Sequence, residues 1–438
     1  MSNSVNQNIK PIGTRRNKTG NLEISGCDIT ELAKKYGTPL YVVDEKTLKQ
    51  IAKEYKNAFS SYKNVKMMYA SKALMTGAIA QILHKEGFGF DVVSGGEIYT
   101  VHNAKIDLNC ATFNGNNKTK DEIEMAINYG IGRISVDNFY ELSLLNQILE
   151  EKNKKQEVLL RITPGIECHT HEYIQTGQID SKFGFDLSQI DEAVDLILNK
   201  YKNIELKGLH AHIGSQIFET QVYYDEIGIL IKELKRINDK YSLNLNEINI
   251  GGGLGITYTK EDCPPSVETI AKTIMEAIQE NCKKYEIEEP ILYIEPGRSI
   301  VGTAGVSIYT IGSTKQVPNG RKYIAVDGGM ADNPRPIMYE AKYLAEIANN
   351  KQGSKREKVT VAGRFCESGD ILIKDIELAE PKAGDILCIY NTGAYGYSMA
   401  SNYNRVLKPA MVLVNNSQSD IIIKRETYEQ LVQNDVLR

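Results

Sequence analysis

Residues 248–253, with the sequence INIGGG, join a short apolar run to three consecutive glycines. The neighbouring runs, LKGLHAHIGS at 206–215 and LYIEPGR at 292–298, also end in polar or glycine residues. Apolar runs of this length, bounded by such residues, are typical of strands buried in a parallel sheet. We therefore expect residues 248–253 to contain one strand of a larger parallel sheet and the glycine turn that follows it.

The same pattern extends toward the N-terminus, where five further runs bring the total to eight. These five are KMMYASK at 66–72, GFDVVS at 89–94, CATFNG at 110–115, RISVDN at 133–138 and VLLRITP at 158–164. Segments between the runs, such as KTKDEIEMAINYG at 118–130, have the spacing of amphipathic helices. Eight strands with helical crossovers in roughly 250 residues predict a (β/α)8 TIM barrel, whereas six would have favoured an open doubly wound sheet.

The C-terminal third has a different pattern of apolar residues. Seven short apolar runs follow one another from VSIYTI at 306–311 to DIIIKRE at 420–426, almost without helical periodicity. We expect an antiparallel β-barrel or sandwich there, joined by N-terminal residues such as PLYVVD at 39–44. The predicted domains are the barrel at 44–304 and a β domain made of 1–43 and 305–438.

Composition restricts the class of protein. The 438 residues carry a formal charge of −4, which is too balanced to indicate a nucleic-acid or membrane surface, so a small-molecule substrate is expected. The seven cysteines are dispersed without a C-x-x-C pair, and the N-terminus lacks the apolar core of a signal peptide. We therefore expect reduced thiols and a cytoplasmic protein.

Polar or glycine residues end every predicted barrel strand, which is where barrel enzymes place their active sites. The eight are Lys72, Asp91, Asn114, Asp137, Arg161, His212, Gly251 and Glu295. Taken singly, each of these residues could have only a surface or capping role. Together they indicate a ligand-binding site.

The glycines at 251–253 and 255 predict a phosphate site, because a chain without Cβ atoms can turn successive backbone N–H groups toward an anion. Barrels commonly bind phosphate after strands seven and eight. A tight turn required by packing is the alternative. Lys72, at the end of the first strand, would project toward the same end of the barrel as this phosphate site. A lysine beside a phosphate suggests a Schiff-base cofactor.

Six motifs, spread over more than three hundred residues, resemble those of the diaminopimelate decarboxylases, pyridoxal-phosphate enzymes of the alanine-racemase-like barrel class. They are YASKA at 69–73, HIGSQ at 212–216, GGGLG at 251–255, EPGR at 295–298, CESGD at 366–370 and GAYG at 393–396. The segments at 163–185 and 335–343 also look like that family.

The resemblance implies pyridoxal 5'-phosphate as cofactor, with Lys72 as its internal aldimine, His212 against the pyridine ring and Glu295 at the ring nitrogen. A carboxylate there keeps the nitrogen protonated and makes the cofactor a deeper electron sink. An ion pair with Arg298 is the alternative role for Glu295. The implied cofactor-binding residues are Lys72, Asp91, His212, Ser215, Gly252, Gly253, Gly255, Glu295, Gly297, Arg298 and Tyr395.

The resemblance also implies a substrate clamp of Arg298, Arg335 and Tyr339 for a distal carboxylate, since a guanidinium can make two parallel hydrogen bonds to it. Tyr395 would contact the same ligands. Glu367 of the partner subunit would bind the distal ammonium in a homodimer with shared active sites, and Cys366 would donate the proton. A buried, inert thiol is the alternative for Cys366.

Other charged residues are open to two interpretations. Asp91, Glu97 and Arg161 either support the cofactor site or are structural charges. His169 and His171 have a spacing that could bind a metal on a strand, but no partner ligands accompany them, so no metal is expected.

The predicted reaction is decarboxylation of meso-2,6-diaminopimelate to L-lysine, the last step of lysine biosynthesis. The nearest rival is a decarboxylase for carboxynorspermidine or another basic amino acid, although Arg335 and CESGD disfavour arginine and ornithine. A catalytically silent regulatory homologue and a racemase are further alternatives. The intact Lys72 disfavours the first, and Glu295 disfavours the second.

Overall fold

The computed structural model describes residues 4–165, 181–351 and 353–438, which fall into two compact units. One consists of Ala52–Gly255 and Pro264–Gly297, and the other of the remaining stretches, Met1–Ile51, Ile256–Cys263 and Arg298–Arg438. The predicted boundaries at 43/44 and 304/305 stay a prediction.

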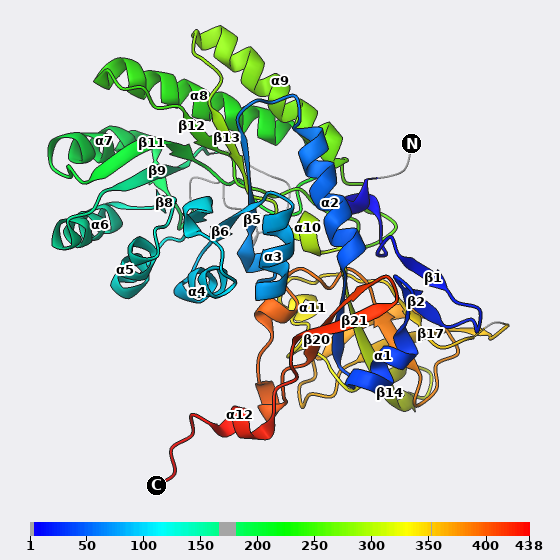
Figure 1. The fold of residues 1–438 in the computed structure, drawn as a ribbon. Helices are drawn as coiled ribbons and strands as arrows, with labels where there is room; N and C mark the ends of the chain where they lie inside the picture. Colours follow the sequence, from blue (N-terminus) through cyan, green and yellow to red (C-terminus); the bar gives the residue numbers. More distant parts are fainter. Residues whose placement is uncertain (1–3, 166–180, 352) are drawn as a thin grey trace. The chain divides into compact units, whose positions relative to one another are not determined.

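The first unit is a closed barrel of eight parallel strands, as predicted (Figure 1). Each expected run forms one strand, and the last strand pairs with the first, which closes the sheet. The strands are β5 (Val65–Ala70), β6 (Gly89–Val92), β7 (Ala111–Phe113), β8 (Arg133–Val136), β9 (Gln156–Thr163), β11 (Ile204–His210), β12 (Glu247–Asn249) and β13 (Ile291–Ile294). A two-residue strand, β10 (Phe185–Asp186), extends β9 at its side.

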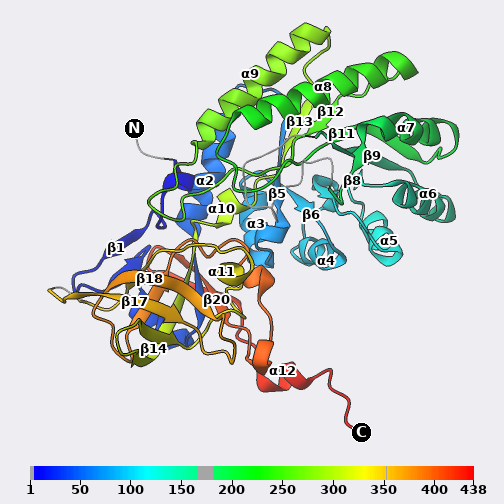
Figure 2. The same cartoon turned by 180° about the vertical axis from the view of Figure 1, so that it is seen from behind.

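Helices cover the outside of this barrel (Figures 1 and 2). Their starts follow local sequence: Thr119 and Glu122 form a capping box at α5, and Ser266 caps α9. The helices of this unit are α3 (Gly77–Lys85), α4 (Gly95–Asn103), α5 (Lys120–Asn128), α6 (Phe139–Lys152), α7 (Ile190–Asn199), α8 (Gln221–Tyr241) and α9 (Val267–Tyr285). The boundary between the units divides α2 (Glu45–Ala58) after Ile51.

Strand register determines which side chains face the barrel interior, because residues paired across neighbouring strands point to the same side. Lys66 pairs with Tyr293, Asp91 with Thr112, and Thr112 with Arg133. Arg161 pairs with His210, and His210 with Asn249. The interior therefore carries polar side chains near both ends of the strands.

The second unit contains a nine-stranded sheet and a three-stranded sheet. The nine strands are β4 (Leu40–Asp44), β14 (Gly305–Gln316), β15 (Lys322–Val326), β16 (Ala345–Ile347), β17 (Arg356–Ala362), β18 (Ile371–Ala379), β19 (Ile386–Ile389), β20 (Ala410–Asn415) and β21 (Gln418–Ile423). The smaller sheet contains β1 (Thr14–Arg16), β2 (Leu22–Ile24) and β3 (Cys27–Asp28).

The N-terminal segment contributes β4 to the large sheet, as expected. The sheet is mixed rather than wholly antiparallel, since β4 pairs in parallel with β20, and β15 with β17. The helices of this unit are α1 (Ile29–Tyr36), α10 (Arg298–Val301), α11 (Arg335–Met338) and α12 (Tyr428–Val432). Among the described helices of both units, none is long and apolar enough to cross a membrane.

Candidate active site

Lys72 lies in a short 3-10 turn, Ser71–Ala73, directly after β5. Its Nζ is 3.3 Å from Oδ2 of Asp91, a fully buried residue at the end of β6, whereas the Lys72 side chain keeps 37% of its surface exposed. Burial raises the pKa of Asp91, the charge of Glu295 adds to this rise, and the Lys72 ammonium opposes it. An exposed amine held beside a buried carboxyl is suited to a covalent ligand that enters from solvent.

Glu295 follows β13 and is held by three side chains from other strands. Its Oε1 accepts hydrogen bonds from Nδ2 of Asn249 at 2.7 Å and from Nδ2 of Asn114 at 3.0 Å. Its Oε2 lies 3.4 Å from Nε2 of His210. Nδ2 of Asn114 also donates to Oδ1 of Asp91 at 2.6 Å, so one amide joins both buried carboxyls.

This network sets the charge of Glu295. Burial by itself would raise the pKa of its carboxyl, but His210, the Lys72 ammonium and the hydrogen bond from Asn249 together hold that pKa well below its ordinary value. Glu295 therefore stays ionised throughout the physiological range, and it presents a fixed negative charge inside the barrel.

The glycine loop after β12 requires residues without side chains. Gly251 and Gly253 have φ values of +61° and +108°, and a Cβ on Gly252 would collide with the carbonyl oxygen of Glu295. The N–H of Gly252 points toward Nδ1 of His212 at 3.3 Å. Glycine is therefore required in this loop by its backbone conformation and by its close packing against Glu295.

The loop after β11 is tied to the glycine loop by two backbone hydrogen bonds. The N–H of Ile217 donates to the carbonyl of Gly253 at 2.9 Å, and that of Gly255 donates to the carbonyl of Ile217 at 3.2 Å. Ser215 lies in this tied segment, half-buried. Burial, together with the positive charges of Lys72 and Arg161, lowers the pKa of His212 well below its ordinary value, so its ring is neutral.

Supporting charges surround these groups. Arg161 lies 3.7 Å from Asp137 and stacks over the Phe183 ring at 4.2 Å. Glu97 accepts a hydrogen bond from the N–H of Val93 at the start of α4, and burial raises its pKa to about 7. Asp91 is thus in direct contact with Lys72, while Arg161 and Glu97 contact neighbouring structural groups.

A second polar cluster lies within the other unit. Nη1 of Arg298 donates to the Tyr258 hydroxyl at 2.8 Å, and Nη1 of Arg335 donates to the Tyr343 hydroxyl at 2.6 Å. The guanidinium of Arg335 stacks over Tyr258 at 4.9 Å, and that of Arg298 over Tyr395 at 4.9 Å. Both arginines are buried, so the cluster presents two desolvated guanidinium groups that aromatic rings hold in place.

The remaining predicted residues differ in exposure. Tyr339 is half-buried at the end of α11, whereas Cys366 and Glu367 are exposed in the single chain, so Cys366 is not the buried thiol of the alternative interpretation. Glu367 caps its own turn by accepting from the N–H of Gly369 at 3.2 Å. Gly297 packs against Ala70 of β5. Cys168, His169 and His171 lie outside the described residues.

Sequence reasoning missed four residues of these clusters. Asn249 and His210 lie inside strands, and Tyr258 falls in a segment without a recognised motif. Tyr343 ends the 335–343 segment, in which only Arg335 and Tyr339 were assigned a role. A signal was available for the first two: a polar residue two positions before a functional strand end points to the same side as that end.

The barrel end has the chemistry that pyridoxal phosphate requires. The close packing of the loop admits no Cβ at Gly252 or Gly253, so backbone groups alone line it there; Glu295 provides an ionised carboxylate, and Lys72 provides a partly exposed amine. The residues therefore fit the group that the motifs implied.

Comparison with known proteins agrees with this geometry. Residues 48–302 match the family model described as "Pyridoxal-dependent decarboxylase, pyridoxal binding domain". Diaminopimelate decarboxylase of Bacillus subtilis is 48% identical over 97% of both chains, and that of Synechocystis is 47% identical over 100% of this chain and 94% of its own. A crystal structure of diaminopimelate decarboxylase from M. jannaschii, in complex with L-lysine, superposes with a TM-score of 0.91 at 36% identity over 98% of both chains.

Proposed function

Because the chain belongs to the diaminopimelate decarboxylases, a family of pyridoxal-dependent decarboxylases, we propose that it converts meso-2,6-diaminopimelate to L-lysine and carbon dioxide. The observation that carries the proposal is that Lys72, paired with Asp91, and the ionised Glu295 lie in one hydrogen-bonded network at the same end of the barrel. The predicted family is thus confirmed, and the substrate is our proposal.

The cofactor would be pyridoxal 5'-phosphate. Lys72 would hold its aldehyde, and the backbone of Gly252, Gly253 and Gly255, with Ser215, would hold its phosphate. The other proposed cofactor-binding residues are Gly297, Arg298 and Tyr395. When bound, the cofactor supplies an electron sink for the pair of electrons left at the α-carbon by departing carbon dioxide.

The chain's own groups set the efficiency of that sink. Glu295 would keep a proton on the ring nitrogen, because an ionised carboxylate stabilises a cation beside it. Asn114, Asn249 and His210 would keep the carboxylate ionised and oriented. The neutral ring of His212 is suited to pack against an aromatic face without adding charge.

The distal half of the substrate carries a carboxylate and an ammonium. Arg298, Arg335 and Tyr339 would bind the carboxylate, and burial of both guanidinium groups strengthens such pairing. Glu367 would bind the ammonium. A substrate with a cationic tail and no distal carboxylate would face two buried guanidinium groups, which disfavours arginine and ornithine as substrates.

The product requires a proton at the α-carbon. We propose Cys366 as its donor, since its thiol is exposed and close in sequence to Glu367. Both residues would act across a homodimer interface, each reaching the active site of the partner. The six described cysteines are all free thiols, which supports a cytoplasmic location.

The central test is incubation of the purified protein, loaded with pyridoxal phosphate, with meso-diaminopimelate. We expect equimolar carbon dioxide and L-lysine, and loss of both in Lys72→Ala but not in Lys63→Ala, an exposed lysine outside the site. Carboxynorspermidine turnover without diaminopimelate turnover would favour the rival decarboxylase. Exchange of the proton at the α-carbon without release of carbon dioxide would indicate a racemase. If none of these substrates is turned over, the protein would be the regulatory homologue.

Shared active sites can be tested by mixing two inactive chains. Lys72→Ala and Glu367→Ala chains, unfolded and refolded together, would regain about a quarter of the activity, because half of the dimers are mixed and each has one intact site. Activity that stays at the level of the separate variants would contradict a partner-supplied Glu367.

A further inference from the structure

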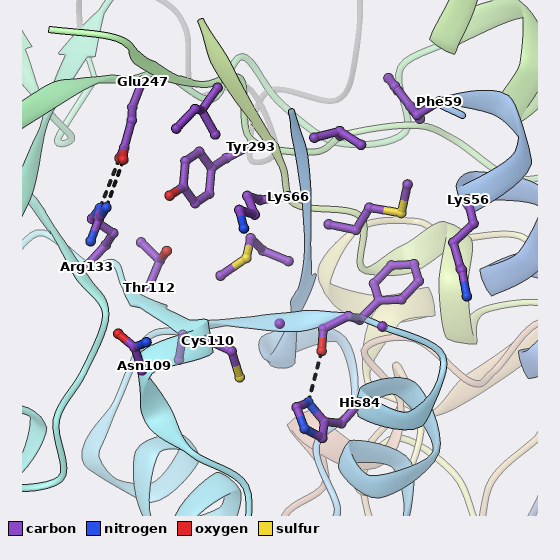
Figure 3. A pocket seen from close by; sticks show the side chains of 18 of the residues that line it. Lys56, Phe59, Lys66, His84, Asn109, Cys110, Thr112, Arg133, Glu247 and Tyr293 are labelled. Carbon is purple, nitrogen blue, oxygen red and sulfur yellow. Dashed lines mark hydrogen bonds and ion pairs between the residues drawn. The ribbon is translucent and has the colours of Figure 1, made fainter. Parts of the chain in front are cut away.

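Two buried acids, one in each unit, are held in different ways. Glu247 of β12 accepts two hydrogen bonds from Arg133, at 2.8 and 2.9 Å, at the end of the barrel where the strands begin (Figure 3). Asp370 of the second unit is 3% exposed, and both of its carboxylate oxygens accept from backbone N–H groups instead. Because a buried N–H needs an acceptor, such a side chain fixes the path of the chain around it.

Two loops leave one edge of the large sheet side by side, because β15 and β17 are parallel neighbours. Residues 327–334 follow β15 and lead to Arg335. Residues 363–370 follow β17 and include Cys366 and Glu367. The two loops therefore carry or adjoin three residues of the proposed reaction.

Asp370 joins these loops. Its Oδ1 accepts from the N–H of Met330 at 2.7 Å, and its Oδ2 accepts from the N–H of Phe365 at 2.9 Å. A Cβ on Gly329 or Gly363 would collide with these oxygens, so both loops need glycine beside the carboxylate. An asparagine could keep only one of the two bonds, because an amide has a single acceptor oxygen.

The turn of Cys366 and Glu367 depends on this junction. Both residues are exposed in the single chain, whereas the flanking Phe365 and Asp370 are buried. The N–H of Glu367 donates to the carbonyl of Phe365 at 2.8 Å, and the N–H of Asp370 donates to the carbonyl of Glu367 at 3.0 Å. The N–H of Cys366 donates to Oδ1 of Asn404 at 3.0 Å. Glu367 is thus bonded on each side to a residue that the junction fixes.

Arg335, by contrast, has supports of its own. Its Nη1 donates to the Tyr343 hydroxyl at 2.6 Å, and its guanidinium stacks over Tyr258. Loss of one bond at the junction should therefore displace the turn at 366–367 before it displaces Arg335.

We propose that Asp370 is a positioning residue, which holds Cys366 and Glu367 in the arrangement that the partner's active site requires. This inference rests on the proposed function, in which those two residues act across the dimer interface. Asp370 therefore serves the active site of the partner rather than that of its own chain.

Asp370→Asn keeps the shape of the side chain and removes one acceptor. In the protein loaded with pyridoxal phosphate, kcat/KM for meso-diaminopimelate should fall about tenfold or more, with cofactor affinity within about twofold of wild type. Asp420→Asn, at an exposed residue of β21 in the same sheet, should change neither. Equal kcat/KM in wild type and Asp370→Asn would overturn the proposal.

Refolding Asp370→Asn chains together with Lys72→Ala chains identifies the affected site. In a mixed dimer the intact Lys72 of one chain meets the intact loop of the other, so activity should reach about a quarter of wild type. Activity no higher than the mean of the separate variants would overturn the proposal. If the mixture of Lys72→Ala with Glu367→Ala also gains nothing, the shared active site is wrong, and the role of Asp370 falls with it.

The position of the turn can also be measured without turnover. Alkylation of Cys366 by iodoacetamide, followed by mass spectrometry, should be about threefold faster or more in Asp370→Asn than in wild type or Asp420→Asn, because a loosened turn leaves the partner's active site more often. Equal rates would overturn the positioning of Cys366, even in a protein that acts on another substrate.

Discussion

Nδ2 of Asn249 donates a hydrogen bond to Oε1 of Glu295 at 2.7 Å, from inside the neighbouring strand. Oδ1 of the same amide accepts from the N–H of Gly251 at 2.9 Å. One side chain therefore fixes the Glu295 carboxylate relative to the glycine loop, so that in the proposed function one group would position both ends of the cofactor.

Asn249→Ala should accordingly weaken both cofactor binding and turnover. A hydrogen bond to a charged group contributes about 1.5–3 kcal/mol, so pyridoxal phosphate affinity should fall about tenfold to a hundredfold. Absorbance titration of the apoprotein measures the affinity, and lysine formation measures turnover. Asn244→Ala removes an exposed asparagine five residues earlier and should leave both unchanged. Unaltered affinity and turnover in Asn249→Ala would show that the amide is dispensable.

Arg335 should determine recognition of the substrate rather than the chemical step. Its guanidinium stacks on Tyr258 and donates to Tyr343, which a lysine ammonium cannot do at the same time. Arg335→Lys should raise KM for meso-diaminopimelate about tenfold or more with little change in kcat, as expected when substrate binding alone is weakened. Steady-state kinetics provide the check, with the exposed Arg321→Lys as control. A fall in kcat at constant KM would contradict this role.

The strand ends of the barrel could be predicted from the sequence because each strand is a short apolar run followed by a polar residue. Asn249 could not, since its importance comes from the pairing of β12 with β13, which puts it opposite Tyr293 and within reach of Glu295, and a single run does not encode this register. The Tyr258 cluster was missed for a related reason: Tyr258 and Arg298 are forty residues apart in sequence, and no periodicity links them.

The direction of the strands in the second unit was another feature that the sequence could not predict. The parallel pairing of β4 with β20 brings together segments about 370 residues apart, and apolar runs indicate strands without indicating their direction. An antiparallel sheet is the usual outcome of successive short strands, and most pairings of this sheet are antiparallel as predicted.

Lys118, which follows β7 near the candidate active site, should contribute strongly to the free energy of unfolding. It is buried, and its Nζ donates to Glu141 at 2.7 Å and to the carbonyls of Gly115 and Ser135 at 2.8 Å each. Lys118→Met would leave the Glu141 carboxyl buried without its cation, so the free energy of unfolding should fall by about 3–5 kcal/mol.

Urea unfolding measures this loss. Adding Glu141→Leu to Lys118→Met should recover part of it, because the uncompensated charge is removed, whereas the half-exposed Lys120→Met should change little. Equal stabilities of Lys118→Met and wild type would show that the buried pair is not required.

Glu226 is a buried acid on α8 that the proposed reaction does not use. It is fully buried, and neither carboxyl oxygen has a hydrogen-bond partner among the described residues. Burial, with a smaller effect from the charge of Glu295, raises the pKa of Glu226 well above its ordinary value. The carboxyl is therefore protonated in the folded protein at pH values where it is ionised in the unfolded chain.

A raised pKa in the folded state gives stability that is fully present below the unfolded pKa of about 4.3 and is lost as the pH rises toward the folded pKa. Glu226→Met removes this titration and an unpaired polar group, so the variant should exceed wild type in stability by about 1–3 kcal/mol. Its advantage should grow from pH 5 upward. Urea unfolding at pH 5, 6, 7 and 8 measures the difference, with the exposed Glu219→Gln as control. An advantage that is constant across this range, or that grows toward acid, would show that Glu226 does not take up a proton on folding.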